Sequence, residues 1–176
     1  MNIKEVAWEI SPEGIHTGGW GLHIQSESLA KFGLLLLNQG KWKGKQLLSS
    51  SWIKQMTSKQ MEAGDEDYGY QMWLCDYPGA VRADGALGQY VLIMPKEDMV
   101  VVITECTLIN GRNQRRLVWN KLLSAIKNQA LIPGKAYARL KKKQISYTLP
   151  TVQGKKQSPL ATAYVCLLYT SDAADE

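Results

Sequence analysis

The stretch RADGALGQYVLIMPKEDMVVVIT, residues 82–104, decides the fold because it holds two short apolar segments rich in β-branched residues. The segments are YVLIM at 90–94 and MVVVITE at 99–105, and turn-forming residues separate them at 95–98. The pattern predicts an antiparallel β-hairpin.

Two glycines precede this hairpin. Gly85 and Gly88 bracket Ala86 and Leu87, and Gln89 follows. Glycine lets a backbone approach a ligand closely and present its N–H groups without a side chain in the way. Such donors at a strand edge suit an oxyanion hole, whereas a β-bulge or a tight turn would use the same glycines. The residues alone leave both interpretations open.

Upstream of the hairpin, residues 26–40 have the apolar spacing of a helix, with Ser26 as the N-cap and Gly40 at the end. The stripe expected to face the core is Leu29, Phe32, Gly33, Leu36 and Leu37. Leu34 and Leu35 fall on the opposite side, so this helix is expected to lie between other elements.

Four further elements complete the expected architecture. A short extended piece covers residues 20–24, and YGYQMWL at 68–74 is typical of a strand. Serines 49–51 cap a short helix that carries Trp52, Ile53 and Met56, and Asn110 begins a long helix through about Gln129. The stripe of that long helix is Val118, Trp119, Leu122, Leu123 and Ile126. These elements predict an α+β fold, with helices packed on an antiparallel sheet.

The composition is that of a globular chain: 176 residues are 45% hydrophobic, enough for one ordinary core. No membrane-spanning run of apolar residues occurs, and the first residues lack the pattern of a signal peptide. Cys75, Cys106 and Cys166 lack metal-ligand spacing, which favours buried free thiols.

The net charge of +5 raises the question of nucleic-acid binding. The basic candidates are KWKGK at 41–45 and three arginines, Arg112, Arg115 and Arg116. They lie in separate elements, and the arginines stand at a helix N-terminus, where the dipole disfavours cations. A solvated surface is therefore favoured, and no nucleic-acid partner is predicted.

No metal site and no cofactor are predicted. His16 and His23 have no carboxylate or cysteine arranged around them. The acidic stretch DEDY at 65–68 lacks the alternating oxygen ligands of a calcium loop, so a solvated loop is favoured there.

The chain changes character after Pro133. Residues 131–165 are rich in lysine and show little periodicity, which predicts a mostly exposed linker towards a further domain. Residues 166–176 match one reading frame of a sequencing-library adaptor and are expected to be non-native; a disordered acidic tail is the alternative. Without that tail the formal charge is about +8.

Several segments resemble, in order and spacing, the C-terminal half of the β-lactamase-related serine hydrolases, a superfamily of class C β-lactamases, penicillin-binding peptidases and related esterases and amidases. The segments are TGGWGLHIQSESLAKFG, GKWKGKQLL, YGYQMWL, GALGQYVLIMP and MVVVIT. The resemblance covers about residues 8–126. It implies a β-lactamase/transpeptidase-like fold for residues 1–130 that is incomplete at the N-terminal side, with an aggregation-prone free edge on MVVVITE or a neighbouring strand.

The resemblance also implies acyl-enzyme chemistry with three motifs: a Ser-x-x-Lys, a tyrosine motif, and a strand-edge motif ending in glycine. The third corresponds to Gly85–Gln89, with the Ala86 N–H as oxyanion donor beside Gly85, and with Leu87, Gly88 and Gln89 as substrate-binding or positioning residues. The first two are expected upstream of Met1. Ser51 has a lysine three residues later but does not occupy the family's nucleophile position.

The common Lys/His-Thr/Ser-Gly form of the third motif is absent, which favours an ester or amide substrate over a β-lactam. The resulting hypothesis is a fragment of a serine hydrolase that is inactive alone. One alternative is a non-catalytic binding or scaffold domain of the same fold, and another is a freestanding basic module. Many relatives are exported, so the resemblance implies export of the intact protein to the periplasm or cell envelope.

Overall fold

A computed structural model of the chain describes residues 1–106, 112–127, 129 and 132–148. The predicted asparagine cap at position 110 and all of the acidic tail lie outside these residues. The chain divides into two units, Met1–Ile126 and Lys127–Glu176. The fold that carries the candidate site belongs to the first unit.

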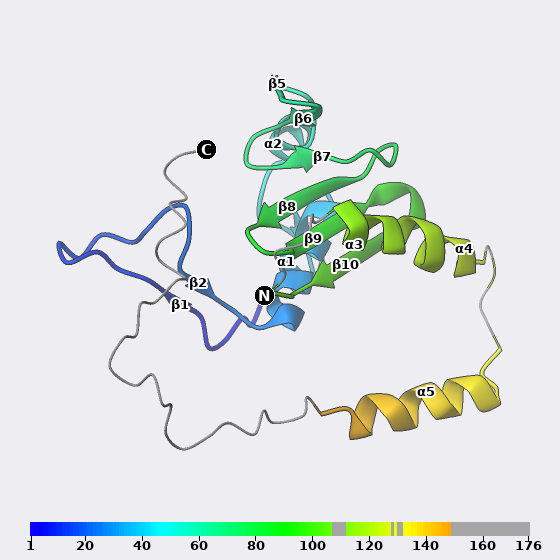
Figure 1. Ribbon diagram of the computed structural model, residues 1–176. Helices are drawn as coiled ribbons and strands as arrows, with labels where there is room; N and C mark the ends of the chain where they lie inside the picture. The colour runs from blue at the N-terminus through cyan, green and yellow to red at the C-terminus, as the bar shows by residue number, and fades with distance from the viewer. Residues whose placement is uncertain (107–111, 128, 130–131, 149–176) are drawn as a thin grey trace, which may run out of the picture. The chain divides into compact units, whose positions relative to one another are not determined.

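The first unit is built on a six-stranded antiparallel sheet in the order β10-β9-β8-β7-β6-β5 (Figure 1). Its strands follow one another in sequence, so each pairs with its neighbour along the chain. They are β5 (Met61–Ala63), β6 (Glu66–Tyr68), β7 (Trp73–Leu74), β8 (Val81–Gly85), β9 (Gln89–Met94) and β10 (Met99–Ile103).

The predicted hairpin is confirmed as β9 and β10, with Met94 opposite Met99 and Tyr90 opposite Ile103. A short 3₁₀ turn at Pro95–Glu97 joins them, and Asp98 closes it with a φ of 49°. The strand β8 is an addition to the prediction, because its sequence VRADG alternates charged and small residues and lacks the β-branched run of its neighbours.

Helices cover both faces of this sheet. Alternate strand residues, such as Val81, Val91 and Val100, pack against α1 (Ser26–Leu37) and α2 (Ser50–Met56). The intervening residues, such as Tyr90, Leu92 and Val101, pack against the C-terminal helix of the unit. The predicted α+β architecture is therefore confirmed, as a helix–sheet–helix sandwich.

The start of α1 differs from the prediction. Gln25 occupies the N-cap position without a side-chain hydrogen bond, and Ser26 is the first helical residue. Leu35 is buried together with Leu36, although it was placed on the outer side, while Leu34 remains exposed. The buried arc is therefore wider than the predicted stripe, and β3 contacts this helix.

The short helix α2 begins as predicted, because the Ser49 side chain accepts a hydrogen bond from the Trp52 N–H. Ile53 is fully buried, and Trp52 stacks on Tyr70 with 5.5 Å between ring centroids. Two small hairpins complete this region: β1 (Ala7–Trp8) with β2 (Leu22–His23), and β3 (Lys41–Trp42) with β4 (Lys45–Gln46).

The helix on the second face is shorter than predicted and irregular. It runs as α3 (Arg112–Leu117), a π-helical segment (Val118–Leu122) and α4 (Leu123–Ala125). It therefore ends at Ala125 and not at Gln129. Val118 is buried on the sheet, and Trp119 and Leu123 pack beside it. The π segment rotates the following turn, which leaves Leu122 and Ile126 exposed.

In the second unit, the structure describes the helix α5 (Lys135–Ser146), every residue of which is exposed. Low periodicity had indicated a linker here, and its central part is helical. The proposed division into residues 1–130, 131–165 and 166–176 stays a prediction. Within the described ranges, no helix has both the length and the apolar character needed to cross a membrane.

A substitution at Gly33 tests the packing of α1 on the sheet. A Cβ at this position would lie 2.5 Å from Cγ1 of Val100 and 3.0 Å from Cγ1 of Val91. Gly33→Ala gains about 1 kcal/mol in helix propensity but overpacks the core at a cost of about 1–3 kcal/mol. We expect a lower free energy of unfolding in urea. In a Val100→Ala background the same change should be neutral or stabilising; a loss of equal size in both backgrounds would contradict this packing.

Candidate active site

The predicted motif Gly85–Gln89 forms the tight turn between β8 and β9, with Gly85 paired to Gln89. Two of its residues have left-handed backbone, Leu87 with a φ of 64° and Gly88 with a φ of 96°. This conformation is uncommon for a leucine. The turn reading of the glycines is therefore confirmed, and it does not exclude a role in binding.

The turn stands at an open end of the sheet. Of the residues of β8, only Val81 and Arg82 pair with β7. On the side of β7, Ala83, Asp84 and Gly85 therefore have no ladder partner among the described residues. Ala86 and Leu87 are exposed. The Ala86 N–H has no acceptor within the part of the chain that the structure describes.

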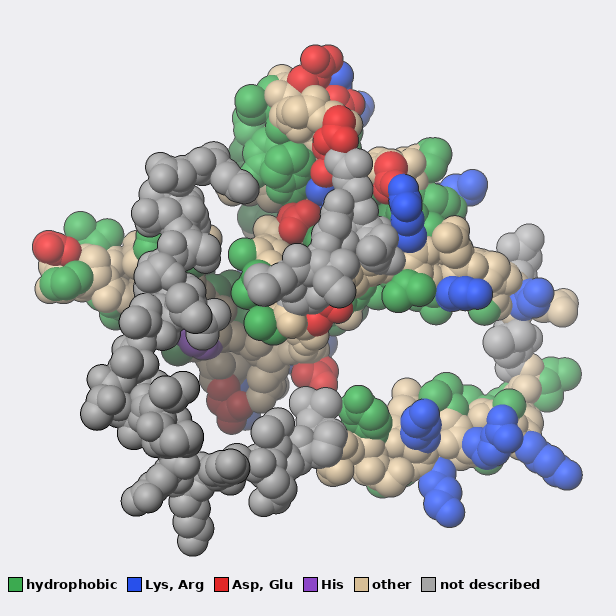
Figure 2. All heavy atoms as spheres, in the orientation of Figure 1, with side chains coloured by type: hydrophobic (Ala, Val, Ile, Leu, Met, Phe, Trp, Pro, Cys, Tyr) green, Lys and Arg blue, Asp and Glu red, His purple; other side chains and the backbone are tan. Residues whose placement is uncertain are grey.

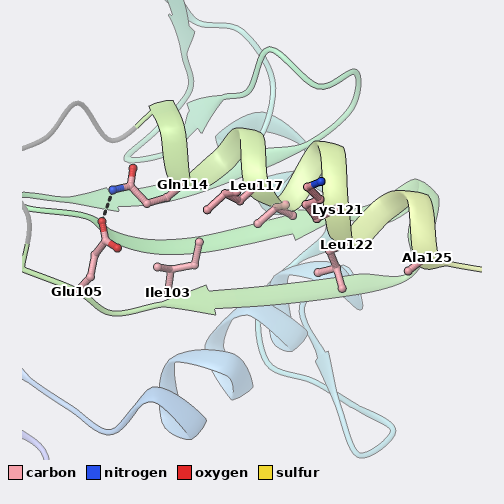
Figure 3. Close-up of a pocket in the computed structure, with 8 residues that line it drawn as sticks. Ile103, Glu105, Gln114, Leu117, Lys121, Leu122 and Ala125 are labelled. Atoms are coloured by element: carbon pink, nitrogen blue, oxygen red, sulfur yellow. Dashed lines mark hydrogen bonds between the residues drawn. The ribbon is translucent and has the colours of Figure 1, made fainter. Parts of the chain in front are cut away.

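Glu105, which follows β10, and Gln114 of α3 hold the turn from the other side. Gln89 Nε2 donates to the backbone oxygen of Glu105, and Gln114 Nε2 donates to its carboxylate (Figure 3). Gly88 is buried, and a Cβ there would overlap the Glu105 side chain. Gln89 is thus committed to a structural contact, and glycine at 88 is required by both its φ and its neighbour.

A buried ion cluster lies beneath the same end of β8. Arg82 is 2% exposed; its Nε donates to Asp84 Oδ2 at 2.7 Å and its Nη2 to Glu66 Oε2 at 2.5 Å. Arg115, 4% exposed, donates to Glu66 Oε1 at 3.0 Å and lies 3.7 Å from Asp84 Oδ2. Two guanidinium groups and two carboxylates therefore alternate, and their formal charges cancel.

The cluster satisfies most of the hydrogen-bonding capacity of Arg82. Burial by itself lowers the pKa of this guanidinium, but the hydrogen bonds to Asp84 and Glu66 outweigh burial and raise the pKa. Arg82 also donates to the Leu74 carbonyl at 3.2 Å and lies over the Trp73 ring. Both arginines are permanently charged and fixed in place, so they serve as electrostatic anchors and not as proton donors.

These contacts correct two sequence predictions. The acidic stretch 65–68 is not a solvated loop: it lies in the β5–β6 hairpin, and Glu66 is part of the ion cluster. Arg115 is not a surface residue either, whereas its neighbour Arg116 is exposed. The sequence did hold one indication of this ion cluster. Arg82 and Asp84 carry opposite charges and are two residues apart, so in a strand both side chains lie on the same face.

An apolar groove of about 490 Å³ runs between β10 and the helix α3–α4 (Figure 3). Its walls include Ile103, Leu117, Leu122 and Ala125, and Glu105 with Gln114 lies at one end. Sequence reasoning missed this groove. It adjoins β10, which pairs only with β9 and so forms one edge of the sheet within the described residues.

No serine–lysine pair is assembled in the described part of the chain. Ser51 Oγ donates to Ser49 Oγ at 3.2 Å, and Lys54 is exposed. The sequence holds two further Ser-x-x-Lys spacings, which had been missed: Ser28 is buried on α1 while Lys31 bonds the Asn2 carbonyl, and the Ser124 hydroxyl bonds backbone carbonyls of its own helix.

The remaining candidates lie apart from the turn. His23 approaches Glu9 at 3.5 Å on an exposed surface, and the described residues contain no group of three or more potential metal ligands.

Cys75 is half-buried and Cys106 is exposed, so the prediction of buried thiols is wrong for Cys106; Cys166 lies outside the described residues. Burial raises the pKa of the Cys75 thiol more than the nearby Arg82 lowers it.

Removing Arg115 tests the ion cluster. Arg115→Met leaves the carboxylates of Glu66 and Asp84, whose side chains are 18% and 23% exposed, with one cation in place of two, and we expect a loss of roughly 3 kcal/mol in the free energy of unfolding. The matched control is Arg116→Met, one residue along and exposed, which should change stability by less than about 0.5 kcal/mol. Equal effects of the two substitutions in urea unfolding would contradict a structural role for the cluster.

The raised pKa of Cys75 predicts its reactivity. The thiolate is the form that alkylates, so near pH 8.5, where a free thiol is about half ionised, Cys75 should hold less thiolate than an ordinary cysteine. We expect iodoacetamide to modify Cys106 about tenfold faster than Cys75 in the folded chain, as measured by peptide mass spectrometry. The difference should vanish in urea, and equal rates without urea would contradict it.

Comparisons with known proteins support the fold. No protein-family model matches the chain, and no curated protein sequence matches it significantly. Solved structures do match, among them a Bacillus anthracis protein assigned as a 6-aminohexanoate-dimer hydrolase, with a TM-score of 0.55 and 25% sequence identity. The alignment covers 77% of this chain and 34% of that protein, so the chain spans about a third of its length. The chain has the mixed α+β architecture of the β-lactamase/transpeptidase-like fold.

Proposed function

We propose that this chain forms part of a serine hydrolase that cleaves an ester or amide bond through an acyl-enzyme. In this proposal the Gly85–Gln89 turn stabilises the oxyanion, with the Ala86 N–H as donor. The serine nucleophile and its neighbouring base come from residues beyond this chain, so the chain alone is inactive. The observation that carries the proposal is the exposed turn at the open end of β8.

The geometry supports this role in two ways. No described residue pairs with the backbone of residues 83–85 on the side of β7, so an extended acyl substrate could pair with it there while its carbonyl oxygen meets the Ala86 N–H. The turn is also fixed, because Gln89 and Gly88 contact Glu105, which Gln114 holds in turn. A fixed donor stabilises a developing oxyanion without reorganising, which is the condition for a large rate effect.

The structural neighbour supports the class of substrate. Its assigned substrate is a dimer of an amino acid, and amino acids joined through their amino and carboxyl groups form an amide. Together with the missing Lys/His-Thr/Ser-Gly form of the motif, this favours an amide or ester over a β-lactam. No metal or cofactor takes part in the proposed reaction, since serine acylation needs only a nucleophile, a base and an oxyanion hole.

The alternative is a non-catalytic binding domain of the same fold. The observation that favours it is that the described residues bring no serine and lysine together. In that case the turn would bind a peptide backbone through β8 without cleaving it. The two proposals differ in one property, the presence of a reactive serine in the extended protein.

The discriminating experiment is to recover the coding sequence upstream of Met1 from the source DNA and to express the extended protein. The hydrolase proposal expects a Ser-x-x-Lys followed by a tyrosine motif, and covalent labelling of that serine by a fluorophosphonate probe. The 176-residue chain, handled in parallel, should not be labelled. An upstream sequence without either motif would overturn the hydrolase proposal in favour of the binding domain.

A substitution in the extended protein tests the oxyanion donor. Ala86→Pro removes a single N–H, and loss of one oxyanion donor lowers kcat by roughly 10²–10³. We therefore expect kcat to fall by that factor against an activated ester with little change in KM. The control Leu87→Ala retains every backbone donor, so kcat should stay within about threefold, and loss of a substrate contact by this side chain should appear in KM. An unchanged kcat in the proline variant would exclude the Ala86 N–H.

A further inference from the structure

The charges of this chain are unevenly distributed along the sequence. Residues 1–105 carry nine basic and thirteen acidic side chains, whereas residues 106–171 carry twelve basic ones and no acidic one. A chain with such an asymmetry concentrates positive potential in one segment. The helix α5 holds the densest part of this basic segment. Its twelve residues include Lys135, Arg139, Lys141, Lys142 and Lys143.

This helix is amphipathic as well as basic. At 3.6 residues per turn, Lys135, Arg139, Lys142 and Lys143 share one arc of the surface. A neighbouring arc holds Ala136, Tyr137 and Leu140. Figure 2 shows the two kinds of side chain on α5, with blue groups projecting along its lower side and green groups gathered along its upper side.

The apolar arc of α5 is exposed. Leu140 is 52% exposed and Tyr137 49%, and no residue of the helix is buried. Lysines flank this arc on both sides, Lys143 on one and Lys141 on the other. Lys141 Nζ lies 5.7 Å from the centroid of the Tyr137 ring, so its stem follows the apolar surface while its charge stays at the rim.

We propose that α5 binds the surface of an anionic phospholipid bilayer, lying in the plane of the interface. Its apolar arc inserts between the headgroups, and the lysines and Arg139 contact the lipid phosphates. The proposal concerns only the second unit and does not depend on the proposed hydrolase function.

The combination of features favours a bilayer over a nucleic acid. A phosphate backbone would attract the same cations, but it offers nothing to an exposed leucine and tyrosine. An anionic bilayer accepts both, since its headgroups are charged and the region below them is apolar. Among the described residues, none of α5 forms an ion pair, and its lysines and arginine are all exposed.

The test is sedimentation of the full 176-residue chain with lipid vesicles. One set contains only phosphatidylcholine, and the other contains phosphatidylcholine mixed with phosphatidylglycerol. We expect the chain to bind the anionic vesicles and not the neutral ones, with a salt-sensitive affinity. Failure to bind anionic vesicles at low salt overturns the proposal.

Matched variants locate the contact. Lys141→Gln, Lys142→Gln and Lys143→Gln together should weaken binding about a hundredfold, at roughly one kcal/mol per cation. The control removes three exposed lysines of the β3–β4 hairpin, Lys41, Lys43 and Lys45, in the same way and should leave the affinity unchanged. An equal loss in both triple variants means non-specific attraction and overturns the assignment to α5.

A second pair of variants separates lipid from nucleic acid. Leu140→Gln removes the central apolar contact and should weaken vesicle binding about tenfold. Leu47→Gln, at a leucine of similar exposure (45%), should have no effect. If Leu140→Gln is also without effect and double-stranded DNA displaces the chain from vesicles, α5 is a polyanion site and the bilayer proposal fails. Far-UV circular dichroism should show equal helix content in all variants.

Discussion

The buried guanidinium of Arg82 is the constraint on which the first unit depends. Its two carboxylate partners come from β8 itself and from β6, and Glu66 and Asp84 in turn hold Arg115 of α3. Three elements far apart in sequence are thereby tied at one point of the sheet. A charge buried in this way is tolerated only while its partners stay in place. The sheet, the helix on its second face and the β5–β6 hairpin are therefore mutually dependent.

The sequence predicted correctly those elements that are specified by local signals, such as a run of β-branched residues or a helix cap. The β9–β10 hairpin follows from two β-branched runs around Pro95, and α2 follows from its serine cap. In both cases the burial pattern and the local propensity agree, which is the condition for reading a fold from one sequence. The resemblance to serine hydrolases implied a β-lactamase/transpeptidase-like fold, and the structural neighbour supports that fold.

The sequence predictions that were wrong share a physical cause. In each case the burial of a residue depends on contacts with distant parts of the chain or on an irregular helical turn, and not on local sequence. Glu66 and Arg115 are ordinary surface residues by composition, and only their meeting across the sheet permits burial. Leu35 is buried although it falls outside the apolar stripe that the spacing of α1 predicts. The π segment shifts the predicted stripe after Val118, a break that periodicity cannot reveal because the apolar spacing is unchanged on either side of it.

The turn that carries the proposed site could be predicted from the sequence, but the contacts that fix the turn could not. Two glycines and a glutamine marked the turn, whereas the groups that fix it, Glu105 and Gln114, lie on other elements. A turn with Leu87 in the left-handed region stores conformational strain, and this strain persists only where surrounding contacts over-determine the backbone. The contacts of Gly88 and Gln89 with Glu105 provide that support. An N–H held in a fixed turn can meet a developing negative charge without first being ordered, which is why the rigidity of this turn matters to the proposed role of the Ala86 N–H.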